Sequence, residues 1–272
     1  MQPDVTELLE FYARPLGATA RRIIAHRVRS RWRRVPGSTL VGLGYATPYL
    51  GSFRGEAHSV TALMPWTQGA VVWPSTGPVH TVVVDEAHLP LADNSVDHLL
   101  AVHCLEASEH VRGLLREIWR VLKPEGRLLI VVPNRRGVWA RFDRTPFGHG
   151  RPFSQSQLER LLAESMLTPI DWSAALYIPP VDRRIVLRSA LSAERIGLRL
   201  SHAFAGVILV EARKELVAPA GKVSPARGLS VLVPHRGTTL QGSGRQTSGP
   251  QTAPLPEHHD GLNENRRLRR WR

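Results

Sequence analysis

The sequence is poor in cysteine, in long apolar runs and in acidic residues to balance its arginines. It has one cysteine, Cys104, among 272 residues, which excludes an internal disulfide and a metal site built from several thiolates. A single thiol suits a reducing compartment. No stretch approaches the roughly 18–20 apolar residues that span a bilayer, and the N-terminus lacks the pattern of a secretory signal. We therefore expect a cytoplasmic protein without a membrane span.

The shortage of acids is concentrated at the two ends of the chain. Lys and Arg exceed Asp and Glu by 13 charges; five of these lie in residues 1–36, five in residues 215–272 and only three in between. Basic flanks hold nucleic acid or an acidic membrane surface in some proteins, and in others they are solvated arms that aid solubility. The uneven charge favours three segments: a basic helical segment over 1–36, a folded domain over 37–214, and a tail over 215–272.

The spacing of apolar residues predicts an α/β fold. Residues 4–34 have helical spacing, with a break near Pro15. Short apolar runs at 39–43, 58–64, 79–84, 96–103 and 127–132 predict strands, and residues 111–122 and 154–166 predict helices. Two closing strands are expected at 171–178 and 203–212, with a long loop over 134–152. Strands that alternate with helices indicate a doubly wound sheet. The Gly-, Pro- and Ser-rich composition after residue 215 predicts a disordered tail.

Ligands of open α/β sheets bind at the carboxyl ends of the strands, so the turns after the strands are the candidate sites. The first turn contains Gly42 and Gly44; glycines let backbone approach a ligand, but a tight strand-to-helix turn needs them for packing as well. The third strand ends at Asp85, whose carboxylate suits either an amino group of a purine or the backbone N–H groups of a turn.

The order of these motifs resembles one known family. A Gly-x-Gly turn is followed by Asp85-Glu86-Ala87-His88-Leu89-Pro90, by Asp93-Asn94-Ser95-Val96-Asp97, and by Arg120-Val121-Leu122-Lys123-Pro124-Glu125-Gly126 before a strand. Over residues 38–213 the chain resembles a class I S-adenosylmethionine-dependent methyltransferase of the type 11 subgroup. The resemblance implies a Rossmann-like sheet of seven strands, mostly parallel with an antiparallel last strand, and S-adenosylmethionine as the cofactor.

The resemblance also implies roles for individual residues. The turn residues Gly42, Gly44 and Tyr45 would pass under the methionine part of the cofactor, and Leu63 and Met64 would lie near the ribose. The acid Asp85 would accept the adenine amino group, with Glu86 and Ala87 beside the ring, and His103 would border the methyl region. Two acids of the family pattern are missing, because Leu40 stands in the first motif and the strand ending at Met64 has no acid. Each unpaired polar group would cost about 1–3 kcal/mol of binding.

Candidates for catalysis and for the acceptor come from the polar residues near the strand ends. Histidine and tyrosine side chains can act as general bases, which makes His103, His149 and Tyr45 the candidates. The arginines that follow the fifth strand or lie in the long loop suit a small anionic acceptor or are surface charges, namely Arg135, Arg136, Arg144 and Arg151. One histidine and two carboxylates within residues 106–110 are too few for a metal site, so we expect no metal.

Three functions remain open on the sequence. The first is a methyltransferase acting on a small molecule. The second is a methyltransferase-fold protein that has lost catalysis and binds or regulates, which the missing acids favour. The third is a nucleic-acid protein that uses the basic flanks; the fourth strand lacks the Asn/Asp-Pro-Pro-aromatic motif of amino-methylating nucleic-acid enzymes, so this function is the least expected. The motifs name neither the acceptor nor an oligomeric state.

Overall fold

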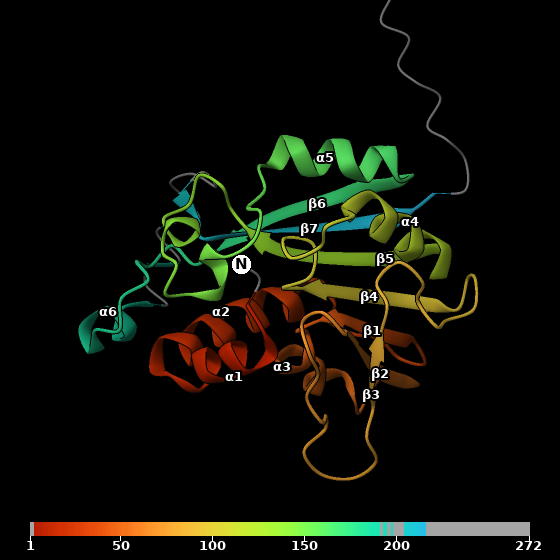
Figure 1. Ribbon diagram of the computed structural model, residues 1–272, viewed down its shortest axis with the longest axis horizontal. Coiled ribbons are helices and arrows are strands. Elements are labelled where there is room, and N and C mark those ends of the chain that lie inside the picture. The colour runs from red at the N-terminus through yellow and green to blue at the C-terminus, as the bar shows by residue number, and fades with distance from the viewer. Residues whose placement is uncertain (1–2, 191–192, 195–196, 198–203, 216–272) are drawn as a thin grey trace, which may run out of the picture. The chain divides into compact units, whose positions relative to one another are not determined.

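The computed structural model describes residues 3–190, 193–194, 197 and 204–215, and these form one sheet with helices on both faces (Figure 1). The strands lie in the order β3-β2-β1-β4-β5-β7-β6. Their bounds are β1 Thr39–Gly44, β2 Ser59–Pro65, β3 Thr81–Val84, β4 Val96–Val102, β5 Leu122–Pro133, β6 Leu167–Ala175 and β7 Val207–Lys214. The helices with more than one turn are α1 Val5–Ala13, α2 Pro15–Arg31, α4 Val111–Val121, α5 Gln155–Glu164 and α6 Arg184–Arg188, and α3 is the short helix Thr47–Leu50.

The sheet has the predicted topology. Strands β1 to β5 pair in parallel, and β7 pairs antiparallel to both β5 and β6. Six strands therefore run one way and the last runs the other way, which confirms the expected Rossmann-like class. Strand order reverses at β1, which lies between β2 and β4. The carboxyl ends of these strands form the crevice in which doubly wound sheets bind their ligands.

The alternation of side chains along the central strands divides the core into two layers. Leu40, Leu100 and Leu129 pack with α1 and α2 in one cluster, whereas Val41 and Leu99 pack with α4 and α5 in the other. Successive residues of a strand point to opposite faces, so a continuous apolar strand serves both layers. Figure 1 shows α1 and α2 on one side of the sheet and α4 and α5 on the other.

The N-terminal helices are fixed to the sheet by specific contacts. The side chain of Asp4 accepts a hydrogen bond from the Glu7 backbone N–H at 2.9 Å and caps α1. Pro15 begins α2 at a position where its missing N–H costs nothing. The indole N–H of Trp32, just after α2, donates to Glu211 on β7 at 3.1 Å. Residues 5–35 thus share a core with the sheet, whereas the predicted tail over 215–272 lies outside the described residues except for Glu215.

The two closing strands begin at other residues than predicted. Strand β6 begins at Leu167, earlier than the expected 171, and α5 ends before it at Glu164 rather than at 166. Pro169 lacks the N–H that a strand interior donates, and the ladder with β7 accommodates it in a register shift between Pro169 and Asp171. Strand β7 begins at Val207 rather than at 203, and residues 198–203 lie outside the described part of the chain.

No helix among the described residues is long and apolar enough to cross a membrane.

Candidate functional site

A cavity of about 770 Å³ opens at the carboxyl ends of β2, β3 and β4, beside the start of α4. This is the crevice that the strand order predicts. The segments that line it are 65–67 after β2, 85–87 after β3, 106–110 after β4, 113–114 on α4 and 150–151 in the long loop. Residues Asp85, Glu86 and Ala87, predicted as cofactor contacts, are therefore brought together at one wall.

The turn after β3 presents a carboxylate to this cavity. Oδ1 of Asp85 accepts a hydrogen bond from the Ala87 backbone N–H at 2.9 Å, which is the turn geometry that the sequence left open as an alternative. Its other oxygen, Oδ2, lies 3.9 Å from Nδ1 of His88. The neighbouring Glu86 accepts a hydrogen bond from the Ser108 hydroxyl at 2.7 Å, so the turns after β3 and β4 are linked across the cavity wall.

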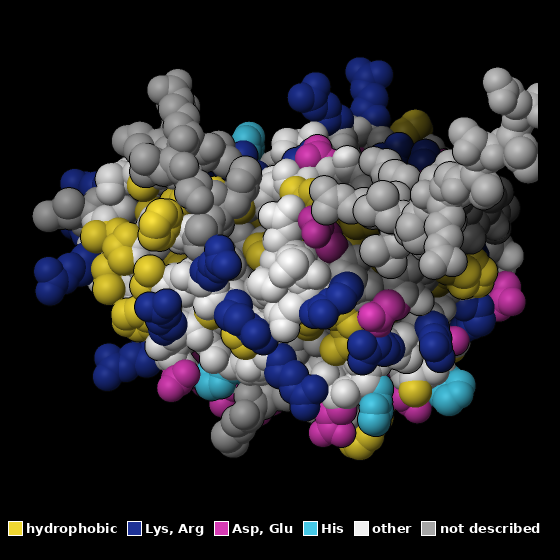
Figure 2. Space-filling model, turned by 90° about the horizontal axis from the view of Figure 1, so that it is seen from above, with side chains coloured by type: hydrophobic (Ala, Val, Ile, Leu, Met, Phe, Trp, Pro, Cys, Tyr) yellow, Lys and Arg dark blue, Asp and Glu magenta, His cyan; other side chains and the backbone are white. Residues whose placement is uncertain are grey.

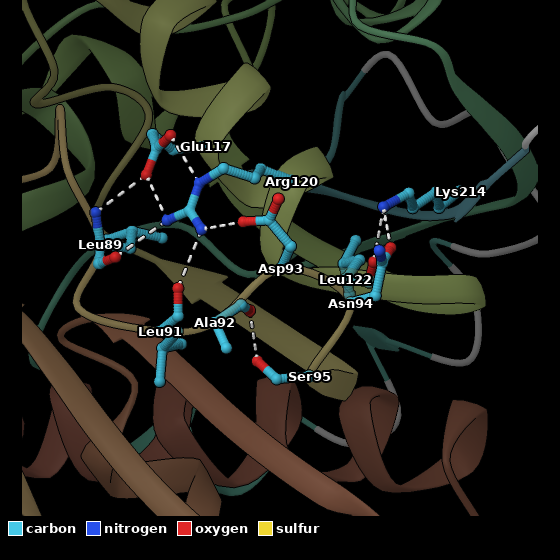
Figure 3. A network of polar contacts seen from close by, with 10 residues as sticks. All are labelled: Leu89, Leu91, Ala92, Asp93, Asn94, Ser95, Glu117, Arg120, Leu122 and Lys214. Carbon is cyan, nitrogen blue, oxygen red and sulfur yellow. Dashed lines mark hydrogen bonds and ion pairs between the residues drawn. The ribbon is translucent and has the colours of Figure 1, made fainter.

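One arginine of α4 holds the segment that follows this turn (Figure 3). Arg120 donates through Nε and Nη2 to the two carboxylate oxygens of Glu117, at 3.0 and 2.8 Å. It also donates to Oδ1 of Asp93 at 2.6 Å and to the backbone carbonyls of Leu89 and Leu91, both at 2.9 Å. Glu117 completes the clamp by accepting the Leu89 backbone N–H at 3.0 Å. Hydrogen bonding from Arg120 lowers the pKa of the Glu117 carboxyl.

Two lysines extend this attachment to the strands. Lys123 donates to both carboxylate oxygens of Asp97, at 2.9 and 2.8 Å, and Asp97 in turn accepts the Thr39 backbone N–H at the start of β1. The buried Lys214 on β7 donates to the side chain of Asn94 at 2.7 Å (Figure 3). Burial lowers the pKa of Lys214. The residues that carried the family resemblance therefore bind the loop before β4 to the sheet.

The glycine turn after β1 does not line the cavity. A Cβ on Gly42 would lie 2.7 Å from the Leu50 side chain, and one on Gly44, whose φ is +75°, would lie 2.4 Å from the Val102 carbonyl oxygen. Close packing against α3 and β4 therefore requires both glycines. The next residue, Tyr45, is buried and its ring stacks on Tyr12 of α1 with centroids 5.6 Å apart.

The predicted contacts at the ends of β2 and β4 are also buried behind the cavity wall. Leu63 and Met64 are in the core and do not line the cavity. His103 is buried with a left-handed backbone, φ 49°. Its Nε2 lies 2.8 Å from the Tyr12 hydroxyl, its Nδ1 lies 3.2 Å from Oε1 of Glu106, and its carbonyl accepts a hydrogen bond from Gln68 at 2.7 Å.

Tyr12 joins this buried cluster to a further hydroxyl. Its oxygen lies 3.0 Å from that of Tyr49. Burial raises the pKa of Tyr12 well above its ordinary value and raises that of Tyr49 as well. Both phenols therefore remain protonated at neutral pH and serve as hydrogen-bond donors. The side chains of His103 and Tyr45 are held in packing contacts that leave them away from the cavity.

The arginines predicted to bind an acceptor separate into three places. Arg135 and Arg151 line a cavity of about 410 Å³ that adjoins the first one and shares Glu109 and His110 with it. Arg136 lines a different cavity beside β6. Arg144 lines a third cavity against α1 together with His149, whose Nε2 lies 2.7 Å from the Asp143 carbonyl oxygen. The structure thus brings Arg135 and Arg151 together near the first cavity and leaves the other two elsewhere.

The residues after β4 were undervalued on the sequence. Glu106, Ser108, Glu109 and His110 all line the main cavity, but residues 106–110 were considered only as a metal site. Their position directly after the strand beside the switch point is the signal that could have identified them. Among the described residues, no group of three His, Cys, Asp or Glu side chains could hold a metal ion.

Comparisons with known proteins agree with this fold. Residues 41–130 match the family model of the methyltransferase domain. One similar structure is the complex of the Haloferax volcanii Trm112 methyltransferase activator with its methyltransferase partner, at 20% identity and a TM-score of 0.54 over 70% of this chain and 88% of that one. Another is a possible histamine N-methyltransferase from Thermotoga maritima, at 16% identity and a TM-score of 0.52 over 78% of this chain and 96% of that one.

The third comparison shows that this fold hosts different reactions. The [4+2]-cyclase SpnF is 23% identical, with a TM-score of 0.51 over 71% of this chain and 80% of its own. Comparison with curated proteins finds no match. At these identities the likeness shows the fold and leaves the reaction open.

Proposed function

We propose that the chain is a class I S-adenosylmethionine-dependent methyltransferase, in keeping with the methyltransferase domain matched over residues 41–130, and that its main cavity binds the cofactor for methyl transfer to a small, anionic acceptor. The observation that carries the proposal is the acidic character of the cavity at the switch point. When bound, the cofactor supplies an activated methyl group on a sulfonium.

The charge of the cavity suits a cationic ligand. Four carboxylates line it, from Asp85, Glu86, Glu106 and Glu109, against a single guanidinium, that of Arg151. A nucleotide with phosphate groups would meet repulsion from these carboxylates, whereas S-adenosylmethionine carries a sulfonium and an ammonium. The side chains present therefore fit the cofactor of the class, and they discriminate against the phosphate-bearing dinucleotides that bind other doubly wound sheets.

The adenine end is best placed at the turn after β3. Asp85 uses one oxygen for its own turn, so its position is fixed before any ligand arrives. The other oxygen has no hydrogen-bond donor among the described residues and is suited to the exocyclic amino group of adenine. The apolar side chains of Pro65, at the end of β2, and Leu114, on α4, both line the cavity and suit a planar ring.

The adjoining cavity is the proposed place for the acceptor. Arg135 and Arg151 line it together with Phe153 and Leu161, a combination that suits a small molecule with an anionic group and an apolar part. His110 borders both cavities. Methyl transfer needs alignment of acceptor and sulfonium above all, and where the acceptor must lose a proton, His110 is the imidazole placed between the two.

A second candidate function is cofactor binding without turnover. Tyr12 covers Tyr45 and the hydroxyl of Tyr12 reaches His103, so the α1 helix occupies the side of the crevice next to the glycine turn. This favours a protein that binds the adenosine end while the reacting end stays blocked. This second function is tested by supplying labelled S-adenosylmethionine together with small anionic acceptors. Binding of the cofactor without any methylated product supports it.

Calorimetry with S-adenosylmethionine tests the proposal. We expect saturable binding by the full chain and a loss of affinity of about tenfold in Asp85→Asn, because one charged hydrogen bond to the ligand is worth about 1.5 kcal/mol or more. Asp182→Asn is the matched control, since Asp182 is exposed and does not line the cavity. Absence of both heat and a shift in melting temperature at millimolar cofactor would refute the proposal.

A further inference from the structure

We propose that Glu106 receives a positively charged centre of the cofactor and so replaces the acid that the sequence lacks at Leu40. This inference rests on the proposed function. It concerns the loop after β4, whereas the missing acid belongs to β1.

The carboxylate of Glu106 is buried and only half satisfied. The residue is 3% exposed and lines the main cavity. Its Oε1 lies 3.2 Å from Nδ1 of His103, and its Oε2 has no hydrogen-bond partner among the described residues. A buried carboxylate oxygen without a partner is costly. A cation that enters the cavity would remove this cost, so the unpaired oxygen favours a positively charged ligand over a neutral one.

Several elements fix the position of Glu106. His103 can donate from Nδ1 to Glu106 while its Nε2 accepts the hydroxyl of Tyr12, so one ring tautomer satisfies both contacts. The Glu106 carbonyl accepts the Arg151 backbone N–H at 2.8 Å. Gly150 packs so closely on this carbonyl that a Cβ would lie 2.3 Å from its oxygen. Contacts from α1, from the end of β4 and from the long loop therefore place the carboxylate before the ligand binds.

The other polar groups near the crevice are less suited to this role. Asp85 and Glu109 are exposed to water, and the half-buried Glu86 accepts a hydrogen bond from Ser108. Gln68 has a buried, unpaired Oε1, but the side chain is neutral and does not line the cavity. The side chain of Leu40 packs in the core shared with α1 and α2, so this face of β1 is closed to any ligand.

The test is the affinity of Glu106→Gln for S-adenosylmethionine and S-adenosylhomocysteine, measured by calorimetry. The substitution keeps shape and removes charge, so we expect S-adenosylmethionine to bind about ten- to a hundredfold more weakly. An equal loss for S-adenosylhomocysteine, which keeps the ammonium, assigns the ammonium to Glu106. A loss confined to S-adenosylmethionine assigns the sulfonium. Either result supports the proposal.

Glu109→Gln is the matched control, because it removes a second carboxylate from the same cavity, and we expect a loss of less than about threefold from the weaker field alone. Glu106→Asp, which keeps the charge, is the second variant should Glu106→Gln fail to fold, and we expect it to bind more weakly than wild type. Wild-type affinity in every folded Glu106 variant would overturn this inference. Absence of binding by the wild type would instead overturn the proposed function.

Discussion

Arg120 shows how one residue can account for a sequence marker. The Arg-Val-Leu-Lys-Pro phrase is part of the family resemblance, and helical spacing alone places its arginine off the apolar stripe of α4. In the structure its guanidinium donates to two backbone carbonyls and to Asp93 in the loop after β3, and to Glu117 of its own helix. Helical spacing shows which face a residue occupies but not which distant segment it meets, so this clamp could not be predicted from the sequence.

Loss of the clamp should be costly. We expect Arg120→Met to lower the free energy of unfolding by about 2–4 kcal/mol, because it leaves the carbonyls of Leu89 and Leu91 and the partly buried Glu117 without their donor. Urea denaturation measures the difference. Arg116→Met is the control on the exposed side of the same helix, and its effect should stay within about 0.5 kcal/mol. Equal effects of the two variants would contradict the clamp.

The clamp also predicts a dependence on pH. The pKa of Glu117 is lowered in the folded state by hydrogen bonding from Arg120, so its contribution is present above the unfolded pKa of about 4.3 and is lost as the pH falls through the lower folded value. The stability difference between the wild type and Arg120→Met should therefore be smaller at pH 3 than at pH 7. Urea denaturation at both pH values measures this. The same difference in the free energy of unfolding at pH 3 and pH 7 would contradict a stabilising Glu117–Arg120 ion pair.

At the scale of elements, the bounds of strands made almost wholly of apolar residues could be predicted. The bounds of strands that also contain polar or turn-like residues could not. The run from Arg127 to Val132 is nearly all apolar and was recognised as a strand, whereas the turn-like residues Lys123 to Gly126 concealed that β5 already begins at Leu122. Strand β6 has only three buried residues among nine and contains Pro169, so the apolar pattern alone did not locate its start. Its position is set by pairing with β7, a contact across some forty residues that propensity does not encode.

The α1 helix offers a direct test of whether the N-terminal segment belongs to the folded domain. Leu8 is 0% exposed and Leu9 is 47% exposed, so two neighbouring leucines face the core and the solvent. We expect Leu8→Ala to lower the free energy of unfolding by about 2–4 kcal/mol through the cavity that it leaves, and Leu9→Ala to change it by less than about 0.5 kcal/mol. Thermal and urea unfolding compare them. A small effect of Leu8→Ala would mean that α1 is an accessory arm.

At the scale of the whole molecule, the net charge and the charge of the site have opposite signs. The chain carries an excess of 13 positive charges, but its main cavity is lined mostly by carboxylates. Figure 2 shows Lys and Arg side chains spread over the visible face, with Asp, Glu and His among them, rather than gathered in one patch. The positive excess is therefore a poor guide to the ligand of this domain.

Removing the basic C-terminal residues separates their charge from that of the cavity. The residues that line the cavity lie between Pro65 and Arg151, far from residues 222–272 in the sequence. We expect a chain ending at residue 221 to keep its melting temperature and to bind S-adenosylmethionine within about twofold of the full chain. Any salt-sensitive binding of nucleic acid by the full chain should disappear in the same variant. Calorimetry and a gel shift measure the two, and loss of cofactor binding would assign part of the site to residues 222–272.

The single cysteine lies at an informative position. Cys104 directly follows His103 in the sequence and is buried. Burial raises the pKa of its thiol well above the ordinary value. A thiol in this state reacts only when its surroundings open. The chain thus carries a natural reporter beside the crevice: the rate at which a thiol reagent labels this one sulfur records how often the wall around β4 opens, without any engineered label and against no background from other cysteines.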